Sequence, residues 1–248
     1  MTQPRVWKIH LDRPLAPGGW RSLSDAERER ARRLGSARER HRFMVAHAAL
    51  RAILGDVCGV RAARLAFGTE DGGRPYVTLP HGRTAPGFDL PDDEAAPDSN
   101  LSHSRAVADS NLLRGRGAPD FNLSHSEEWA LVAVAPPGSR VGVDVERIRE
   151  DLDCLAMAGS MYQREEVDRL REAGPSGLRT GYFRLWTAKE AYVKAVGVGL
   201  AGLRNVLVRE ESTTHGAVLS PPGAALPVRW LDVAPGYAAA VVTAAAAS

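Results

Sequence analysis

The sequence has little cysteine and no long hydrophobic run, and each absence excludes a class of protein. Cys58 and Cys154 are the only cysteines in 248 residues, too few for a disulfide framework or a four-ligand zinc site. No run reaches the roughly 18 apolar residues that a membrane span needs, and the opening MTQPRVWKIH lacks the charged-then-apolar pattern of a signal peptide. We therefore expect a soluble, cytoplasmic protein with no membrane partner.

Two widespread sequence motifs are also missing. The chain contains no G-x-x-x-x-G-K-S/T and no G-x-S-x-G. These absences exclude a P-loop nucleotide site and the nucleophile elbow of a serine hydrolase. We also expect no Rossmann dinucleotide site, because the G-x-G-x-x-G match at 197–202 directly follows a predicted helix, whereas the Rossmann fingerprint follows a strand.

Lysine is scarce, because only Lys8, Lys189 and Lys194 are lysines among 32 cationic residues. Two lysines five residues apart suggest a functional reason, with chance clustering as the alternative. The net charge is only +2, but residues 1–60 hold twelve Lys and Arg against six Asp and Glu. This local excess favours a small anionic partner. It is too modest, and too poor in interleaved aromatics, to favour nucleic acid.

The hydrophobic pattern predicts an α+β fold in two halves, residues 1–137 and 138–248, joined at a turn near 136–140. Ser24 and Ser36 begin capping boxes and therefore predict helix starts, while a Pro-, Asp-, Gly- and Ser-rich stretch at about 80–121 predicts a long irregular insertion. The predicted helices are 24–34, 36–55, 163–173 and 181–196, and the predicted strands lie within 5–11, 65–79, 129–135, 141–146, 206–209, 228–234 and 237–244.

The segment VGVDVE places Asp144 and Glu146 two residues apart on a predicted strand. Alternate strand residues point to the same face, so the two carboxylates are neighbours. In a valine-rich environment they repel each other and lose solvation, and a hard cation such as Mg2+ relieves both costs. The alternative is an exposed strand face whose acids pair with Arg147 and Arg149.

The segment GYFRLWTAKEAYVKAVGVGL predicts a helix with two different sides. Trp186, Glu190 and Lys194 are spaced by four residues and share one side. A Glu four residues before a Lys is also a common surface pair, but Trp186 on the same side argues against a purely solvated surface. The opposite, buried side is expected to hold Leu185, Ala188, Tyr192 and Ala195.

The sequence NLSHS occurs twice, at 100–104 and 122–126. Only the second copy directly precedes an apolar strand, so Ser124 and His125 are expected at the edge of regular structure, whereas His103 has no such support. A histidine beside a short polar side chain can bind a phosphate, although a lone histidine is more often structural.

Taken in order, FNLSHSEEW, VGVDVER and FRLWTAKEAYVKAVGVGL resemble the three signature motifs of the Sfp-type 4′-phosphopantetheinyl transferases, the third in the W-x-x-K-E-A form of its subgroup. LDRPL, SDAERERARRL, the HRF…R helix and GRPY are also similar to family features, so the resemblance extends over nearly the whole chain.

The resemblance implies a pseudo-twofold pair of similar α/β halves with coenzyme A in the cleft between them. It implies a holo-acyl-carrier-protein synthase reaction. The 4′-phosphopantetheine arm of coenzyme A moves to a serine of an acyl or peptidyl carrier protein, with Mg2+ as cofactor and adenosine 3′,5′-bisphosphate as product. A chain with two halves would act as a monomer. A non-catalytic coenzyme A or nucleotide-binding module and an interaction protein without a small ligand are the alternatives.

The resemblance also implies roles for particular residues. Asp144, Glu146 and a third acid would hold the metal, and the third acid falls best on Glu166, with Glu165 adjacent. Glu190 would be the base for the carrier serine.

The implied coenzyme A site draws on both halves. Lys194, a catalytic candidate as well, and Lys189 would lie near the phosphates. The remaining contacts would come from Arg30, Arg42, Arg74, Ser124 and His125, the three arginines acting through the phosphates.

Overall fold

The computed structural model describes residues 3–70, 73–79, 117–221 and 223–246. Residues 80–116, most of the predicted insertion and the whole first NLSHS copy with His103, lie outside the described residues. The insertion was predicted to extend to residue 121, but regular structure has already begun at Asp120.

The N-terminal half contains the elements β1 (Arg5–His10), α1 (Gly19–Ser22), α2 (Asp25–Arg33), α3 (Ala37–Cys58), β2 (Ala66–Thr69), β3 (Pro75–Thr78), β4 (Asp120–Ser126) and β5 (Trp129–Ala135), with a 3-10 turn at Ala62–Arg64. Both predicted capping boxes are present. The Ser24 side chain accepts a hydrogen bond from the backbone N–H of Glu27, and the Ser36 side chain accepts one from the backbone N–H of Glu39. In return, each glutamate carboxylate accepts a hydrogen bond from the backbone N–H of its serine.

The C-terminal half contains β6 (Ser139–Arg147), α4 (Cys154–Met161), α5 (Arg164–Glu172), α6 (Gly174–Val196), β7 (Leu207–Glu210), β8 (His215–Ser220), β9 (Ala224–Trp230) and β10 (Tyr237–Ala245), with a 3-10 segment at Leu200–Asn205. Helix α6 starts seven residues before the predicted position. The sequence GPSG reads as a loop, yet Pro175 occupies the first helical turn, where a missing N–H costs nothing.

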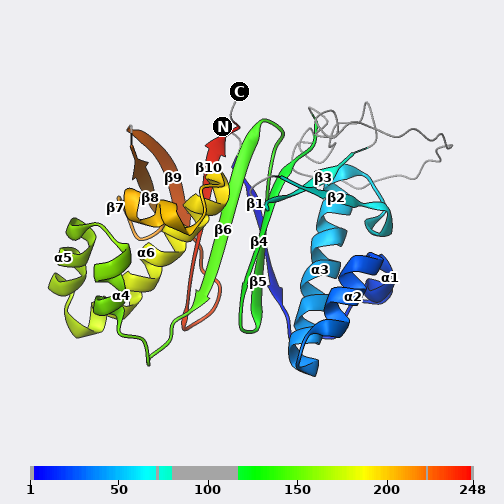
Figure 1. The fold of residues 1–248 in the computed structure, drawn as a ribbon, viewed down its shortest axis with the longest axis horizontal. Coiled ribbons are helices and arrows are strands. Elements are labelled where there is room, and N and C mark those ends of the chain that lie inside the picture. Colours follow the sequence, from blue (N-terminus) through cyan, green and yellow to red (C-terminus); the bar gives the residue numbers. More distant parts are fainter. Residues whose placement is uncertain (1–2, 71–72, 80–116, 222, 247–248) are drawn as a thin grey trace.

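Within the described residues, the strands form three antiparallel sheets: one in the order β1-β5-β4, one in the order β6-β10-β9-β8-β7, and the pair β2-β3. Figure 1 shows the two larger sheets side by side in the centre, with α3 on the outer side of one and α6 on the outer side of the other. The α+β class is therefore confirmed. The pseudo-twofold likeness and the boundary between residues 137 and 138 stay predictions.

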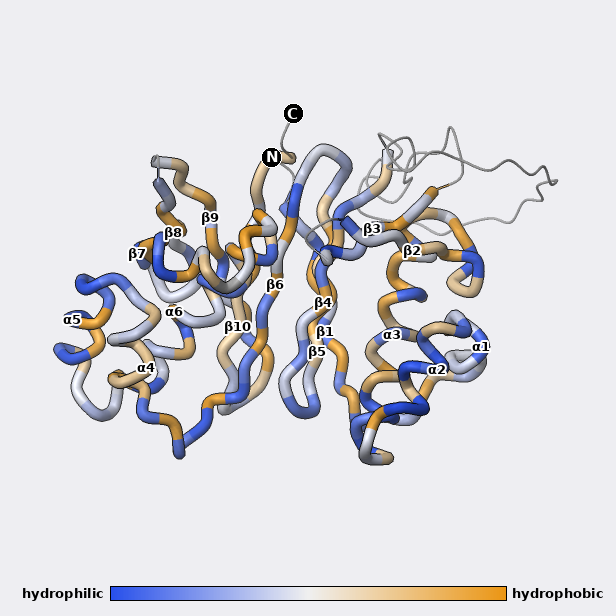
Figure 2. The backbone as a smooth tube through the Cα atoms, in the orientation of Figure 1, coloured by the Kyte–Doolittle hydropathy of each residue, from blue (hydrophilic) through white to orange (hydrophobic). Residues whose placement is uncertain are grey.

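Strand β5 explains how the layers hold together. Its sequence WALVAVA is apolar throughout because both of its faces are buried. Val132 and Val134 pack with Leu54 of α3, whereas the alternating residues Leu131 and Ala133 pack against the other sheet. In Figure 2 hydrophobic colour marks much of α3 and the central strands, while the outer helix α2 is largely hydrophilic.

Helix α6 lies closely against β6 at a glycine. A Cβ at Gly142 would lie 2.0 Å from the carbonyl oxygen of Ala191, so any larger side chain would push the helix away. The predicted buried side of α6, Leu185, Ala188, Tyr192 and Ala195, is buried in this core. Within the described ranges, no helix combines the length and the apolar character needed to cross a membrane.

Candidate active site at the junction of two sheet edges

Strands β4 and β6 are edge strands of different sheets, and side chains rather than backbone bonds connect them. Every second residue of β4 is polar and turned toward β6. Asp120 and Asn122 accept the backbone N–H groups of Val141 (2.7 Å) and Val143 (3.0 Å). The side chains of β4 thus satisfy backbone N–H donors of β6 on the edge to which no strand of the described residues is hydrogen-bonded through its backbone.

The same row of side chains meets the two acids of VGVDVE. The Ser124 hydroxyl donates to Asp144 Oδ1 (2.8 Å), and Lys194 Nζ on α6 donates to the same oxygen (2.6 Å). Asp144 is 3% exposed, and its Oδ2 is buried without a hydrogen-bond partner. Burial raises the pKa of Asp144, against the opposing effect of Lys194. The alternative of an exposed acid paired with Arg147 or Arg149 is wrong for this residue.

Glu146 and Glu190 complete an acidic cluster around Asp144. The Ser126 hydroxyl donates to Glu146 Oε2 (3.0 Å), and the nearby Trp186 side chain favours the charged form of this carboxylate. Burial raises the pKa of Glu146, and the charge of Asp144 raises it further. Burial likewise raises the pKa of Glu190, with Lys194 opposing and both other acids adding to the shift. The predicted common side of Trp186, Glu190 and Lys194 therefore faces β6.

Glu166, the expected third metal ligand, lies elsewhere. Its carboxylate pairs with Lys189 Nζ (2.8 Å), both side chains are 0% exposed, and it accepts the backbone N–H of Val208 (2.8 Å). Lys189 also donates to the carbonyls of Leu203 and Val206, so its ammonium is enclosed by protein atoms. Neither Glu166 nor Lys189 lies beside Asp144, because the two form a pair that connects α5, α6 and the start of β7.

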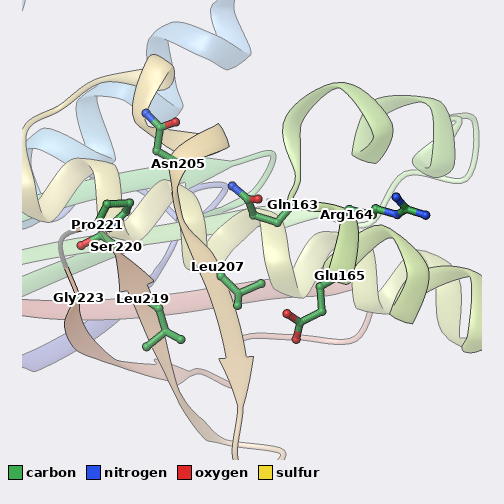
Figure 3. Close-up of a pocket in the computed structure, with 9 residues that line it drawn as sticks. All are labelled: Gln163, Arg164, Glu165, Asn205, Leu207, Leu219, Ser220, Pro221 and Gly223. Atoms are coloured by element: carbon green, nitrogen blue, oxygen red, sulfur yellow. The ribbon is translucent and has the colours of Figure 1, made fainter.

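The neighbouring candidate, Glu165, is exposed on α5. It lines a shallow cavity between the start of α5 and strands β7 and β8, with Gln163, Leu207 and Leu219 among the other lining residues (Figure 3). In the described part of the chain, no three His, Cys, Asp or Glu side chains are preassembled as a metal-binding group. Asp144 is close enough to raise the pKa of both Glu146 and Glu190, and Glu146 adds to the shift of Glu190.

Positive groups gather beside this cluster, on the side of the N-terminal half. The pKa of His125 is lowered, first by the protein atoms that desolvate its ring and then by the charges of Lys194, Arg30 and Arg42. Arg30 is exposed and stacks over Phe43, with 5.5 Å between its Cζ and the ring centroid. Four of the residues predicted to contact coenzyme A are therefore near one another.

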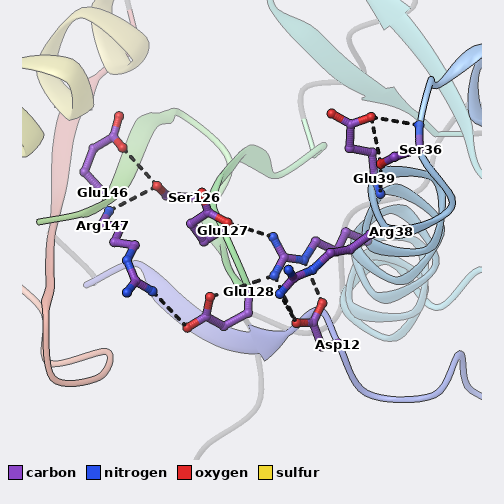
Figure 4. Close-up of polar contacts among 10 residues, drawn as sticks. Asp12, Ser36, Arg38, Glu39, Ser126, Glu127, Glu128, Glu146 and Arg147 are labelled. Atoms are coloured by element: carbon purple, nitrogen blue, oxygen red, sulfur yellow. Dashed lines mark hydrogen bonds and ion pairs between the residues drawn. The ribbon is translucent and has the colours of Figure 1, made fainter. Parts of the chain in front are cut away.

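Arg42 already holds carboxylates. It donates to Asp12 through Nε (2.6 Å) and Nη2 (2.9 Å) and to Glu127 through Nη1 (3.1 Å). These bonds hold the pKa of Asp12 far below its usual range. Figure 4 shows the carboxylates of Asp12 and Glu127 in this group of polar contacts, and both form ion pairs with Arg42. A cluster that binds carboxylates in this way is suited to phosphate as well.

Arg74 departs from its expected role as a phosphate contact. It is buried, and its guanidinium bonds to Asp120 and to the backbone carbonyls of Val141 (2.6 Å) and Lys194. Arg74 therefore fastens β6, the end of α6 and β4 to one another, and its charge is directed into the protein.

Sequence reasoning missed the polar row of β4, of which Asp120, Asn122 and Ser126 went unnoticed. The signal was present in DFNLSHS, where polar residues alternate with Phe121, Leu123 and His125. Because most of its residues are polar and it follows a loop-like segment, the pattern predicts no strand here: the expected insertion extends to residue 121, and Ser124 and His125 are expected only at the edge of regular structure.

Comparisons with known proteins agree with these motifs. Residues 140–242 match the 4′-phosphopantetheinyl transferase superfamily. The chain is similar to the 4′-phosphopantetheinyl transferase HetI of Nostoc sp., with 29% identity over 88% of this chain and 78% of HetI. It is also similar to the 4′-phosphopantetheinyl transferase Sfp of Bacillus subtilis, with 22% identity over 97% of this chain and 92% of Sfp. A further 4′-phosphopantetheinyl transferase of Bacillus subtilis is 24% identical over 88% of this chain and 82% of its own length.

Proposed function

Because the chain belongs to the 4′-phosphopantetheinyl transferase superfamily, we propose that it transfers the phosphopantetheine arm of coenzyme A to a serine of an acyl or peptidyl carrier protein. The observation that carries this proposal is the meeting of Asp144, Glu146, Glu190 and Lys194 beside the cations of the N-terminal half. Such a site offers acids for a cation, a base for a hydroxyl and positive charge for phosphates.

The donor set fits a hard divalent cation. Asp144 Oδ2 is a buried carboxylate oxygen without a partner, and burial together with mutual repulsion disfavours ionisation of Glu146. A cation removes both penalties. We propose that Asp144 and Glu146 hold Mg2+, which when bound supplies neutralisation of the negative charge on the pyrophosphate. Glu166 has no part in this proposal, because Lys189 occupies its carboxylate.

The chain's own residues would do the rest. Glu190, in its ionised form, takes the proton from the carrier serine hydroxyl as the serine oxygen attacks the phosphorus that carries the pantetheine arm. The bond from that phosphorus to the adenosine 3′,5′-bisphosphate breaks, and the bisphosphate leaves with its charge. Lys194 lies next to Asp144 and provides a compact positive charge for a phosphate oxygen.

Binding of coenzyme A would use the N-terminal half. Arg30 and Arg42 place positive charge beside the acidic cluster, and the His125 ring, whose pKa is lowered, adds a neutral N–H donor; these groups suit the phosphates of coenzyme A. Arg42 exchanges carboxylate partners for phosphate oxygens in this proposal. Since both halves of one chain supply the site, a monomer suffices.

The test is the mass of the carrier. Several apo-carrier proteins are each incubated with the full chain, coenzyme A and Mg2+. We expect at least one of them to gain the mass of a single phosphopantetheine arm. The Asp144→Asn variant should give no gain within the same time, and Ser160→Ala, which removes an exposed hydroxyl on α4, should match the parent chain. Coenzyme A binding without transfer to any carrier would support the non-catalytic module and overturn the proposal.

A further inference from the structure

We propose that Ser126 is a positioning residue for Glu146, an inference that rests on the proposed function. Ser126 is the last residue of β4 and belongs to the N-terminal half, whereas Glu146 lies on β6. Its hydroxyl donates to Glu146 Oε2 (3.0 Å), as Figure 4 shows. One half of the molecule thus orients an acid that the other half supplies.

The direction of the Ser126 proton is fixed by a second hydrogen bond. A serine hydroxyl has one proton to donate and lone pairs that accept. The backbone N–H of Arg147 donates to Ser126 Oγ (3.0 Å) and occupies the accepting side. The proton is therefore left for the neighbouring carboxylate, and the hydroxyl acts as a one-way donor to Glu146.

The serine is itself held in place by a tight turn. Ser126 pairs with Trp129 across the β4–β5 hairpin, whose two turn residues are Glu127 and Glu128. Glu127 has φ of 48°, in the left-handed region that residues other than glycine rarely adopt. Without coenzyme A, ion pairs on both sides keep this turn in position: Glu127 with Arg42 (3.1 Å) and Glu128 with Arg147 (3.7 Å).

Loss of the Ser126 hydroxyl should weaken the affinity of the site for the cation without changing the number of residues that bind it. Ser126 touches neither substrate nor metal in this proposal. Without its hydroxyl, Glu146 keeps its carboxylate but loses the bond that fixes the side chain. Hydrogen bonds of this kind, made to a ligating side chain by a residue behind it, typically change metal affinity by about 10- to 100-fold.

The experiment measures Mn2+ binding to the full chain by electron paramagnetic resonance, with and without coenzyme A. We expect Ser126→Ala to raise the Kd for Mn2+ by about tenfold. Ser126→Thr, which keeps the hydroxyl, should remain close to the parent value, and so should the exposed Ser160→Ala. Saturating Mn2+ should restore most of the transfer rate of Ser126→Ala, a rescue that general damage to the fold would not allow.

The controls separate this inference from the proposed function. If the parent chain binds Mn2+ and Asp144→Asn does not, while Ser126→Ala binds as the parent does, Ser126 has no positioning role and the metal site stands. If the parent chain binds no Mn2+ even with coenzyme A, the metal site and the role of Ser126 are both wrong. Should Ser126→Ala not fold, Ser126→Cys, similar in size but a weak donor, replaces it with the same expected increase in Kd.

Discussion

At the scale of single residues, the acids at the junction are held in surroundings that oppose their charge. Burial raises the pKa values of Asp144, Glu146 and Glu190, the charge of Asp144 adds to the shifts of both glutamates, and Glu146 adds to that of Glu190. Lys194 offsets only part of this effect. Clusters of buried acids are common at functional sites, because a bound cation or substrate supplies the charge compensation that the protein alone does not provide.

Glu190→Gln should make the protein more stable at alkaline pH. The pKa of Glu190 is raised above 4.5 in the folded protein, so from pH 4.5 up to the raised value the folded state binds more protons than the unfolded state. The free energy of unfolding therefore falls as the pH rises across that window, and above the window it stays lower than it is near pH 4.5. The neutral amide removes this loss.

Thermal unfolding at two pH values measures the effect. We expect Tm of Glu190→Gln to exceed that of the parent chain at pH 8 and to equal it near pH 4. Glu150→Gln, at an exposed position, is the matched control and should show no such difference. A Glu190→Gln protein with lower Tm at pH 8 would show that the site does not oppose ionisation of this carboxyl.

Arg74→Ala should act on stability. Arg74 and Asp120 form a buried pair with side chains 8% and 5% exposed, and removing one partner of such a pair costs about 3 to 5 kcal/mol. Arg33, whose side chain is 76% exposed and paired with Glu29, is the control, for which truncation should cost less than about 1 kcal/mol.

Urea denaturation compares the two arginine variants. A large loss in the free energy of unfolding for Arg74→Ala agrees with its place between the halves. Unchanged stability combined with a large loss of coenzyme A affinity would instead restore Arg74 to the phosphate site.

Periodicity predicted some of these residues and not others. The strand repeat of two and the helix repeat of four place Asp144 with Glu146 and Glu190 with Lys194 from sequence alone. Arg74 could not be assigned in this way, because a long side chain reaches inward or outward equally well. Its partner Asp120 is 46 residues away in the sequence.

At the scale of elements, β4 was hard to predict because its polar side chains serve an edge from another sheet. A strand next to solvent and a strand next to the bare edge of β6 have the same alternating pattern. Only the contacts of Asp120, Asn122 and Ser126 with β6 distinguish them. Helix α5 shows the same limit, since its capping box accounts for one oxygen of Glu166 but does not indicate that the other accepts the backbone N–H of Val208.

Glu166→Gln should loosen the attachment of α5 to α6 and leave metal binding unchanged. It removes the charge that balances Lys189 in a fully buried pair, and breaking such a pair costs about 3 to 5 kcal/mol. Changing Lys189 to Met together with Glu166 to Gln leaves no unpaired charge, so the double variant should lose less than the sum of the single losses.

Urea denaturation of the two single variants and the double variant measures this coupling, and Mn2+ titration of Glu166→Gln measures its metal affinity. Unchanged stability with a large loss of Mn2+ affinity would return Glu166 to the set of metal ligands.

At the scale of the whole molecule, the site exists because two sheets meet edge to edge. The three-stranded sheet supplies Ser124 and Ser126, the five-stranded sheet supplies Asp144 and Glu146, and α6 supplies Glu190 and Lys194 (Figure 1). The apolar pattern predicted the α+β class and most elements. The strand order β6-β10-β9-β8-β7 could not be predicted, because it depends on contacts between distant parts of the chain.

The most direct measurement is anomalous diffraction from Mn2+ in crystals grown with coenzyme A. We predict a peak about 2 Å from Asp144 Oδ2, with Glu146 also in contact and the phosphates of coenzyme A reaching toward Lys194 and the cations of the N-terminal half. A Mn2+ peak beside Glu165 or Glu166, or coenzyme A bound away from the β4–β6 junction, would contradict the assignment of this junction as the active site.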